Sequence, residues 1–210
     1  MVMSPSKSRR RRPRKKKSNK KIILLVAFLA VVAVIIVVAS LSGTNKSEPV
    51  KVQLMTNMGN IVIELRDDMP ITTDNFKKLV QEGVYDNTIF HRVIDGFMIQ
   101  GGDPMGTGQG DPSIPTIQDE FSDDNRNLRG TIAMAKQADL TTGQVVPDSA
   151  SSQFFINLVD NNGLDSDFAV FGNVIEGMDV VDRIAEVETD GEPYNRPLED
   201  VTLIKAQLVD

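Results

Sequence analysis

The alternation and spacing of apolar residues over 50–210 predict many short strands and two helices. Residues 50–55 and 61–65 have the pattern of two strands, and the polar segment 57–60 between them is typical of a turn. Gly and Asp residues separate the later apolar runs. These runs predict strands at 89–93, 97–100, 131–135, 153–157, 169–174 and 201–209.

Two segments show the spacing of amphipathic helices. The first begins at Thr72 or Thr73, either of which can cap a helix, and ends near Gly83. The second covers 178–185. Their apolar faces are Phe76, Leu79 and Val80 in the first helix, and Val180, Val181 and Ile184 in the second. Many short strands with two helices predict a mainly β domain, a closed antiparallel barrel with helical lids.

The segment 22–39 has no charged or polar side chain, no Gly and no Pro. Together with Ser40 and Leu41 it has the length of a membrane-spanning helix, so we expect one N-terminal transmembrane helix at 22–41. A buried globular helix is disfavoured because such helices are rarely apolar on all sides. The remaining alternative is a secretory signal cleaved among the small residues 39–43, although the apolar part of such signals is usually shorter.

Charge predicts how this helix is oriented. Residues 1–21 hold 11 of the 23 Lys and Arg residues and no acidic residue, which leaves 12 basic and 29 acidic residues in the remainder. The positive-inside rule therefore predicts a basic cytoplasmic tail at 1–21, a signal-anchor at 22–41, a linker at 42–49 and an extracytoplasmic domain at 50–210. The expected location is a cell membrane crossed once, or secretion if the signal is cleaved. No aromatic residue is interleaved in the tail, which disfavours nucleic acid as its partner.

Composition excludes several chemistries. The chain has no cysteine, which rules out disulfides, thiolate metal sites and a cysteine nucleophile. His91 is the only histidine, and no Gly-x-Ser-x-Gly elbow accompanies it, so a hydrolase triad is disfavoured and we expect a packed structural histidine. The acidic residues in 119–124 lack the order of a calcium loop, and we expect them on a solvated face.

Three segments, in register, resemble the cyclophilin family of peptidyl-prolyl cis/trans isomerases. The first is Phe-His-Arg-Val-Ile-Asp-Gly-Phe-Met-Ile-Gln-Gly-Gly-Asp at 90–103. The others are Ser-Gln-Phe-Phe-Ile at 152–156 and Val-Phe-Gly-Asn-Val at 170–174. The resemblance covers about 50–209. It implies a closed eight-stranded antiparallel barrel capped by two α-helices, and isomerisation of X-Pro bonds.

The resemblance also implies roles for individual residues. Arg92 matches the family's catalytic arginine. No metal or cofactor is implied, and the partners expected are flexible, proline-containing polypeptides. The residues that match the family's substrate-binding positions are Phe97, Met98, Phe155 and Leu164 for the proline pocket, Gln100 and Gln153 beside it, Ala135 and Lys136 in the neighbouring groove, and Phe168. Because Phe154 and Phe155 alternate on a strand, we expect Phe154 in the core and Phe155 in the pocket.

The sequence departs from the family pattern at three places. Gly163 stands where many relatives have Trp, which removes a pocket wall and bears on binding of the cyclic peptide cyclosporin. Phe168 offers no hydrogen bond where many relatives have His or Tyr. The segment 137–146 is longer than the corresponding family loop, and it either changes substrate choice or is a tolerated surface insertion. The alternative to an isomerase is thus a membrane-tethered binding module or chaperone with little turnover; in either case we expect a monomeric domain.

Overall fold

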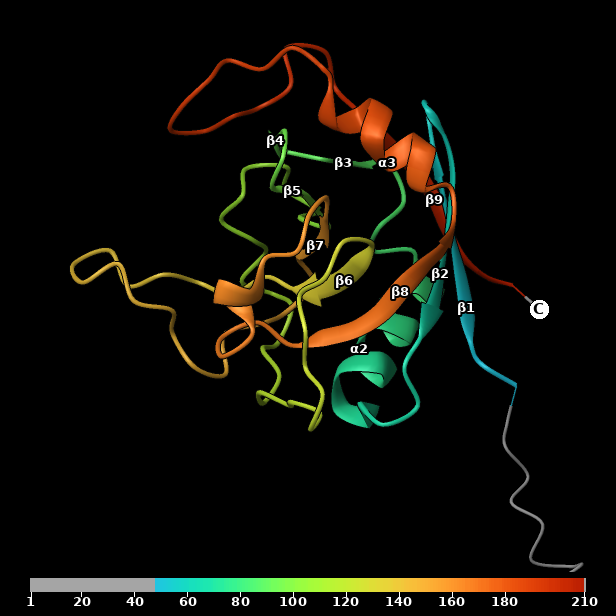
Figure 1. Cartoon of the computed structure of the whole chain (residues 1–210), viewed down its shortest axis with the longest axis vertical. Helices are drawn as coiled ribbons and strands as arrows, with labels where there is room; N and C mark the ends of the chain where they lie inside the picture. The colour runs from blue at the N-terminus through green and yellow to red at the C-terminus, as the bar shows by residue number, and fades with distance from the viewer. Residues whose placement is uncertain (1–47, 210) are drawn as a thin grey trace, which may run out of the picture. The chain divides into compact units, whose positions relative to one another are not determined.

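The computed structural model describes residues 48–209, which form one antiparallel sheet and two α-helices (Figure 1). The strands follow the sheet order β3-β9-β1-β2-β8-β6-β7-β5-β4. The strands are β1 (Lys51–Thr56), β2 (Gly59–Leu65), β3 (Thr88–Ile89), β4 (Arg92–Ile94), β5 (Met98–Gly101), β6 (Thr131–Met134), β7 (Phe154–Asn157), β8 (Val170–Glu176) and β9 (Thr202–Val209). The helices are α2 (Pro70–Gln81), α3 (Met178–Ala185) and a short 3-10 helix, η1 (Asn162–Leu164).

The first two strands confirm the predicted hairpin. Their register ends at Thr56 and Gly59, so the turn consists of two residues. At the turn, β1 therefore continues one residue further and β2 begins two residues earlier than the sequence predicts. Leu54 lies opposite Ile61, and both are completely buried. Alternate residues of β1 are buried, as expected of a strand with one face on the core.

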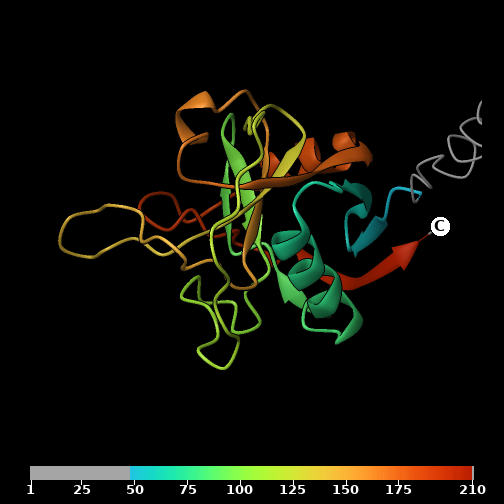
Figure 2. The ribbon, with the colours of Figure 1, turned by 90° about the horizontal axis from the view of Figure 1, so that it is seen from below.

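The part of the sheet described has nine strands, whereas eight were predicted. The difference arises because the segment predicted as a strand at 89–93 is interrupted at Phe90 and His91. The part before the interruption, β3, pairs with β9, and the part after it, β4, pairs with β5. The two edge strands of the sheet are therefore only two residues apart along the chain, which requires the sheet to curl and bring its ends together (Figure 2).

Helix α2 begins earlier than predicted, at Pro70, where the fixed φ of proline suits the first helical position. Thr72 and Thr73 therefore lie inside the first turn, and the expected capping by either is wrong. The carboxylate of Glu120 instead accepts hydrogen bonds from the backbone N–H groups of Ile71 at 3.3 Å and Thr72 at 3.0 Å. A distant acidic side chain thus satisfies free donors at the positive end of the helix.

The two helices lie above and below the strands in the view of Figure 1, α3 at the top and α2 at the bottom. Their predicted apolar faces are confirmed as buried. In the main core, the ring of Phe76 on α2 lies 5.7 Å from Phe154 and 4.9 Å from Phe171, between ring centroids. Phe154 therefore packs in the core, as the sequence predicts.

The N-terminal predictions lie mostly outside the described residues. The basic tail 1–21, the membrane segment 22–41 and most of the linker 42–49 fall in this part of the chain. Among residues 48–209, no helix is long and apolar enough to cross a bilayer.

Candidate active site

A row of side chains runs across four neighbouring strands on one face of the sheet. Arg92 on β4 lies opposite Gln100 on β5, and Gln100 lies opposite Phe155 on β7. Phe155 in turn lies opposite Ala133 on β6. Residues paired in this way have Cβ atoms about 5 Å apart. The antiparallel register thus places a cation, an amide and an aromatic ring side by side, although they are far apart in the sequence.

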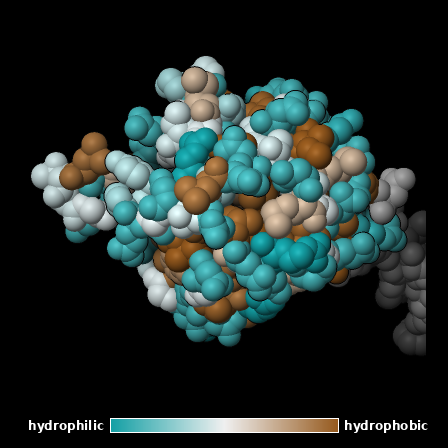
Figure 3. Space-filling model, turned by 90° about the horizontal axis from the view of Figure 1, so that it is seen from above, coloured by the Kyte–Doolittle hydropathy of each residue, from teal (hydrophilic) through white to brown (hydrophobic). Residues whose placement is uncertain are grey.

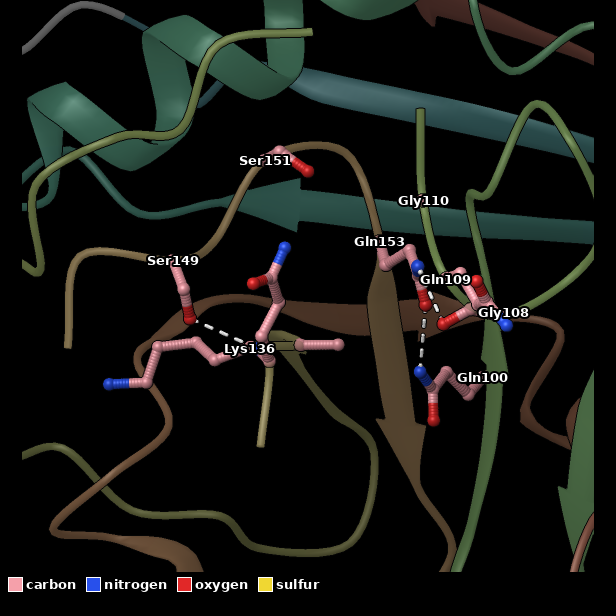
Figure 4. A pocket seen from close by; sticks show the side chains of 10 residues that line it. Gln100, Gly108, Gln109, Gly110, Lys136, Ser149, Ser151 and Gln153 are labelled. Carbon is pink, nitrogen blue, oxygen red and sulfur yellow. Dashed lines mark hydrogen bonds between the residues drawn. The ribbon is translucent and has the colours of Figure 1, made fainter. Parts of the chain in front are cut away.

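The polar members of this row are joined by hydrogen bonds. Nη1 of Arg92 donates to Oε1 of Gln100 at 3.4 Å, and Nε2 of Gln100 donates to Oε1 of Gln153 at 3.0 Å. Nε2 of Gln153 donates to the carbonyl oxygen of Gly108 at 3.1 Å (Figure 4). Partial burial of Arg92 lowers its pKa by desolvation. An arginine ordinarily titrates so far above neutral pH that it stays charged here.

The predicted proline pocket forms one apolar cluster, separate from the main core. Met98 and Phe155 are almost fully buried, with 2% and 5% of their surface exposed. The ring of Phe168 packs edge-on against Phe155, with 5.5 Å between centroids. The predicted residues that this cluster brings together are Phe97, Met98, Ala135, Phe155, Leu164 and Phe168. Four of them are only partly buried, so part of the cluster faces solvent: Phe97, Ala135, Leu164 and Phe168.

Two asparagines that the sequence analysis missed hold the segment that carries Leu164 and Phe168. Asn125 donates from Nδ2 to the carbonyl oxygen of Phe168 at 3.1 Å, and Asn127 donates to the same oxygen at 3.2 Å. Oδ1 of Asn125 also accepts a bond of 2.8 Å from the N–H of Val170. No local pattern could reveal this role, because these bonds link residues 41 to 45 positions apart.

Beyond Gln100 and Gln153 lies a small hollow of about 70 Å³ (Figure 4). It continues the site away from the apolar cluster, with Ala135 next to both. Its walls are mainly backbone and polar side chains, so it suits a polypeptide main chain or a small side chain. The lining residues are Gln100, Gly108, Gln109, Gly110, Ala135, Lys136, Gln137, Ser149, Ser151 and Gln153. Among these, the glycines, the serines, Gln109 and Gln137 were not predicted as site residues.

Lys136 lines this hollow, but its ammonium group is engaged elsewhere. Nζ of Lys136 lies 2.8 Å from Oδ2 of Asp119 and 5.6 Å from the ring centre of Phe121. The Lys136 side chain is only 5% exposed. Asp119 and Glu120 thus have structural partners, and the expectation of a merely solvated acidic face at 119–124 is wrong for these two. The tertiary fold brings Lys136 and Asp119 together from different loops.

The loop 103–110, which supplies Gly108 to the site, is organised around one buried carboxylate. Oδ2 of Asp103 accepts hydrogen bonds from the N–H groups of Thr107 at 2.9 Å and Gly108 at 2.7 Å, and from the hydroxyl of Thr107 at 3.1 Å. Oδ1 accepts a bond of 3.0 Å from the N–H of Met105. Burial raises the pKa of Asp103, but these donors outweigh it, so the net pKa lies below the ordinary value.

His91 is buried, with 7% of its surface exposed, and neither ring nitrogen has a hydrogen-bond partner among the described residues. Desolvation lowers its pKa, which favours the neutral ring. The packed structural histidine that the sequence predicts is therefore confirmed. No group of three or more metal-ligating side chains occurs within residues 48–209.

Fold and site together define a mainly β protein whose surface joins one arginine and two amides to an exposed apolar cluster. The family model described as "Cyclophilin type peptidyl-prolyl cis-trans isomerase/CLD" matches residues 51–208. The chain belongs to this family, and its activity is cis/trans isomerisation of peptidyl-prolyl bonds.

Similar proteins come from bacteria and eukaryotes. A peptidyl-prolyl cis-trans isomerase of Acinetobacter baylyi is 46% identical over 165 residues, which cover 75% of this chain and 84% of that protein. The human peptidyl-prolyl cis-trans isomerase-like 1 is 42% identical over 163 residues, covering 76% and 92%. The crystal structure of a cyclophilin-type isomerase of Cryptosporidium parvum, in the presence of the dipeptide Ala-Pro, is similar with a TM-score of 0.68 and 30% identity, covering 76% and 99%.

Proposed function

We propose that this isomerase holds proline in the apolar cluster and uses Arg92 to stabilise the twisted amide of the transition state. The observation that carries the proposal is the single cross-strand row of Arg92, Gln100 and Phe155. It places a fixed positive charge and an amide beside the apolar cluster that would hold the proline ring.

The chemistry of rotation favours such a site. Rotation must break amide resonance, against a barrier of about 18–20 kcal/mol for an ordinary peptide bond. In the twisted amide the nitrogen becomes pyramidal and regains a lone pair, which can accept a hydrogen bond that the planar ground state accepts poorly. A guanidinium group placed near this nitrogen stabilises the transition state more than the ground state, which is the condition for a faster reaction.

The surroundings of Arg92 fit this role. Gln100 accepts a hydrogen bond from Nη1 and so restricts the guanidinium, while partial burial reduces the screening of its charge by water. Phe97, Met98 and Phe155 would hold the ring still while the acyl side rotates. No nucleophile is needed, since no covalent bond forms or breaks.

We propose in addition that the domain acts outside the cytoplasm, on exported or surface proteins, while tethered by the segment 22–41. The support is the uncharged run 22–39 and the concentration of basic residues before it. A linker of eight residues, 42–49, would keep the isomerase near chains that emerge unfolded. Slow X-Pro isomerisation can limit the folding of such chains.

The mechanism is tested by cis/trans exchange of an Ala-Pro tetrapeptide, measured by NMR with the full chain in detergent. Arg92→Ala should lower kcat/KM by about 10² to 10³, the range for loss of one preorganised transition-state donor, while peptide affinity stays within about threefold. Arg183→Ala is the matched control, because Arg183 forms an exposed ion pair on α3. Undiminished turnover by Arg92→Ala would contradict the mechanism. Binding without turnover in the parent chain would instead support the binding-module alternative.

The topology is tested separately, and the absence of native cysteine makes this direct. We expect a membrane-impermeant maleimide to label Ser113→Cys, an exposed domain position, in intact cells but not Ser6→Cys in the basic tail. Labelling of both only after lysis would contradict an external domain. A mature chain shortened by about 40 residues would indicate a cleaved signal.

A further inference from the structure

The segment 137–146 leaves the body of the domain at the edge of the hollow beside Gln100 and Gln153. Gln137 at its start and Ser149 just beyond its end both line that hollow. The segment projects from the domain, at the left in the two views of Figures 1 and 2. It is therefore continuous with the candidate site on the side away from the apolar cluster.

The root of this projection is held by several hydrogen bonds. The N–H of Gln137 donates to Oγ of Ser149 at 3.0 Å, and that hydroxyl donates to the carbonyl oxygen of Val146 at 2.6 Å. The N–H of Val146 returns a bond of 2.9 Å to the carbonyl oxygen of Gln137. The ion pair between Lys136 and Asp119 lies next to this root and is almost buried on the lysine side. The projection therefore starts from a fixed point in the wall of the site.

The outer part of the projection is an organised hairpin. Ala138 and Val145 form an antiparallel bridge, and the N–H of Asp139 donates to the carbonyl oxygen of Gln144 at 2.8 Å. Oδ1 of Asp139 accepts bonds from the N–H groups of Thr141 at 2.9 Å and Thr142 at 2.7 Å. A carboxylate that binds backbone two and three residues further on is a device that fixes a turn.

This turn displays Leu140, which is fully exposed. Figure 3 shows the projection at the left, with a hydrophobic patch toward its outer end. A single exposed leucine is ordinary on a protein surface. Leu140, however, is held by a fixed turn, and the hairpin that carries it starts in the wall of the site. A long substrate that leaves the site along this hairpin would pass Leu140.

We propose that the hairpin 137–146 is a substrate-binding arm, and that Leu140 contacts an apolar side chain of the bound polypeptide outside the region of the proline. This inference rests on the proposed function. Three to four extended residues separate the root from the tip, at about 3.3 Å each, which gives a reach of about 10–13 Å. An extended substrate covers that span with a similar number of residues, and about one more residue crosses the hollow between the proline and the root. The preferred substrate is therefore an unfolded segment with an apolar residue about five positions from the proline.

The test compares short and long substrates with the full chain in detergent. One peptide is an Ala-Pro tetrapeptide, and the other is a 15-residue peptide with a central Pro and Leu five positions away on both sides. A third peptide has Ser in place of both Leu residues. The variants are Leu140→Ser and a shortened hairpin, in which an Asn-Gly pair that suits a two-residue turn replaces 139–144. Leu208→Ser on β9 is the matched control, an exposed leucine outside the site.

We expect Leu140→Ser to raise KM for the Leu-containing peptide about three- to tenfold, with kcat unchanged and the tetrapeptide unaffected. The shortened hairpin should show at least the same loss, while Leu208→Ser and the Ser-containing peptide should show none. An unchanged KM for the Leu-containing peptide in both hairpin variants would overturn the proposal, as would equal losses for the long peptide and the tetrapeptide. If the parent chain fails to turn over the tetrapeptide, the proposed function fails. The role of the arm is then decided by fluorescence anisotropy, which compares the affinity of the parent chain and of the hairpin variants for the two long peptides.

Discussion

Nε2 of Gln100 donates a hydrogen bond of 3.0 Å to Oε1 of Gln153, from strand β5 to the residue that precedes β7. This bond fixes which end of the Gln100 amide faces Arg92. Because the NH₂ group is engaged by Gln153, the carbonyl end is left to accept from the guanidinium. Gln153 is in turn held by its own bond to Gly108. A residue that need not contact the reacting bond thus orients one that contacts Arg92, the cation of the proposed mechanism.

Replacement of Gln153 should therefore affect catalysis through Gln100. Gln153→Leu removes the acceptor, so the Gln100 amide can turn its NH₂ group toward Arg92, where a donor would face a donor. One lost hydrogen bond of about 1 kcal/mol predicts a fall in kcat/KM of about fivefold. Gln153→Glu keeps the acceptor and should retain more activity. Equal activity of both variants in the NMR exchange assay would show that Gln153 does not orient Gln100.

Loss of the buried Asp103 carboxylate should loosen the loop 103–110. Asp103→Asn replaces hydrogen bonds to a charged group by weaker ones, and we expect a loss of about 2 kcal/mol in the free energy of unfolding. Because folding lowers the pKa of Asp103, its contribution is present above the unfolded-state pKa of about 4 and is lost as pH falls through the lower folded-state pKa. Urea unfolding between pH 7 and pH 3 should thus show a smaller pH dependence in the variant. Asp111→Asn in the neighbouring turn is the control, with an expected change within about 0.5 kcal/mol.

The free energy of unfolding should decrease as the pH falls into the range in which an ordinary histidine titrates. Desolvation lowers the pKa of His91 in the folded state, helped by Arg196 and Arg92 and opposed by Asp103. The unfolded chain then binds a proton below about pH 6.5 that the folded chain does not, so stability decreases as pH falls, by at most about 1.4 kcal/mol per pH unit. His91 is the only histidine, so His91→Gln should remove this dependence between pH 6.5 and 5.5. A persistent slope in the variant would assign the titration to another group.

Gly163 leaves room for a larger side chain beside the apolar cluster. No heavy atom lies within 4 Å of a Cβ built there, and Gly163 is exposed in η1, one residue before Leu164. Gly163→Trp should therefore fold normally and add a wall to the pocket. We expect KM for an Ala-Pro peptide to fall about three- to tenfold and cyclosporin affinity to rise, both measurable by calorimetry. Gly163→Ala is the control, and a tryptophan variant that behaves like it would exclude a missing wall.

The sequence predicted most of the elements and six of the nine members of the apolar cluster, missing Ile94, Ala133 and Val170. Periodicity was sufficient for α3 and for β1 and β2, because each has one face on the core and one toward solvent. The placement of Phe154 and Phe155 on opposite sides followed from strand alternation alone. The prediction was wrong at the start of α2, where the local signal from Thr72 and Thr73 was overridden by Glu120 from a distant loop.

By itself, therefore, the sequence determined the family, the order of the strands along the chain and which residue types line the site, since these depend on local spacing and on short motifs. Only the tertiary structure decided that Arg92, Gln100 and Phe155 form one row, that Asn125 and Asn127 support Phe168, and that Lys136 is paired with Asp119. The physical reason is that strand pairing and buried polar bonds join residues far apart in the chain. Their partners are chosen by register and by the need to satisfy buried donors and acceptors, and no local pattern records either.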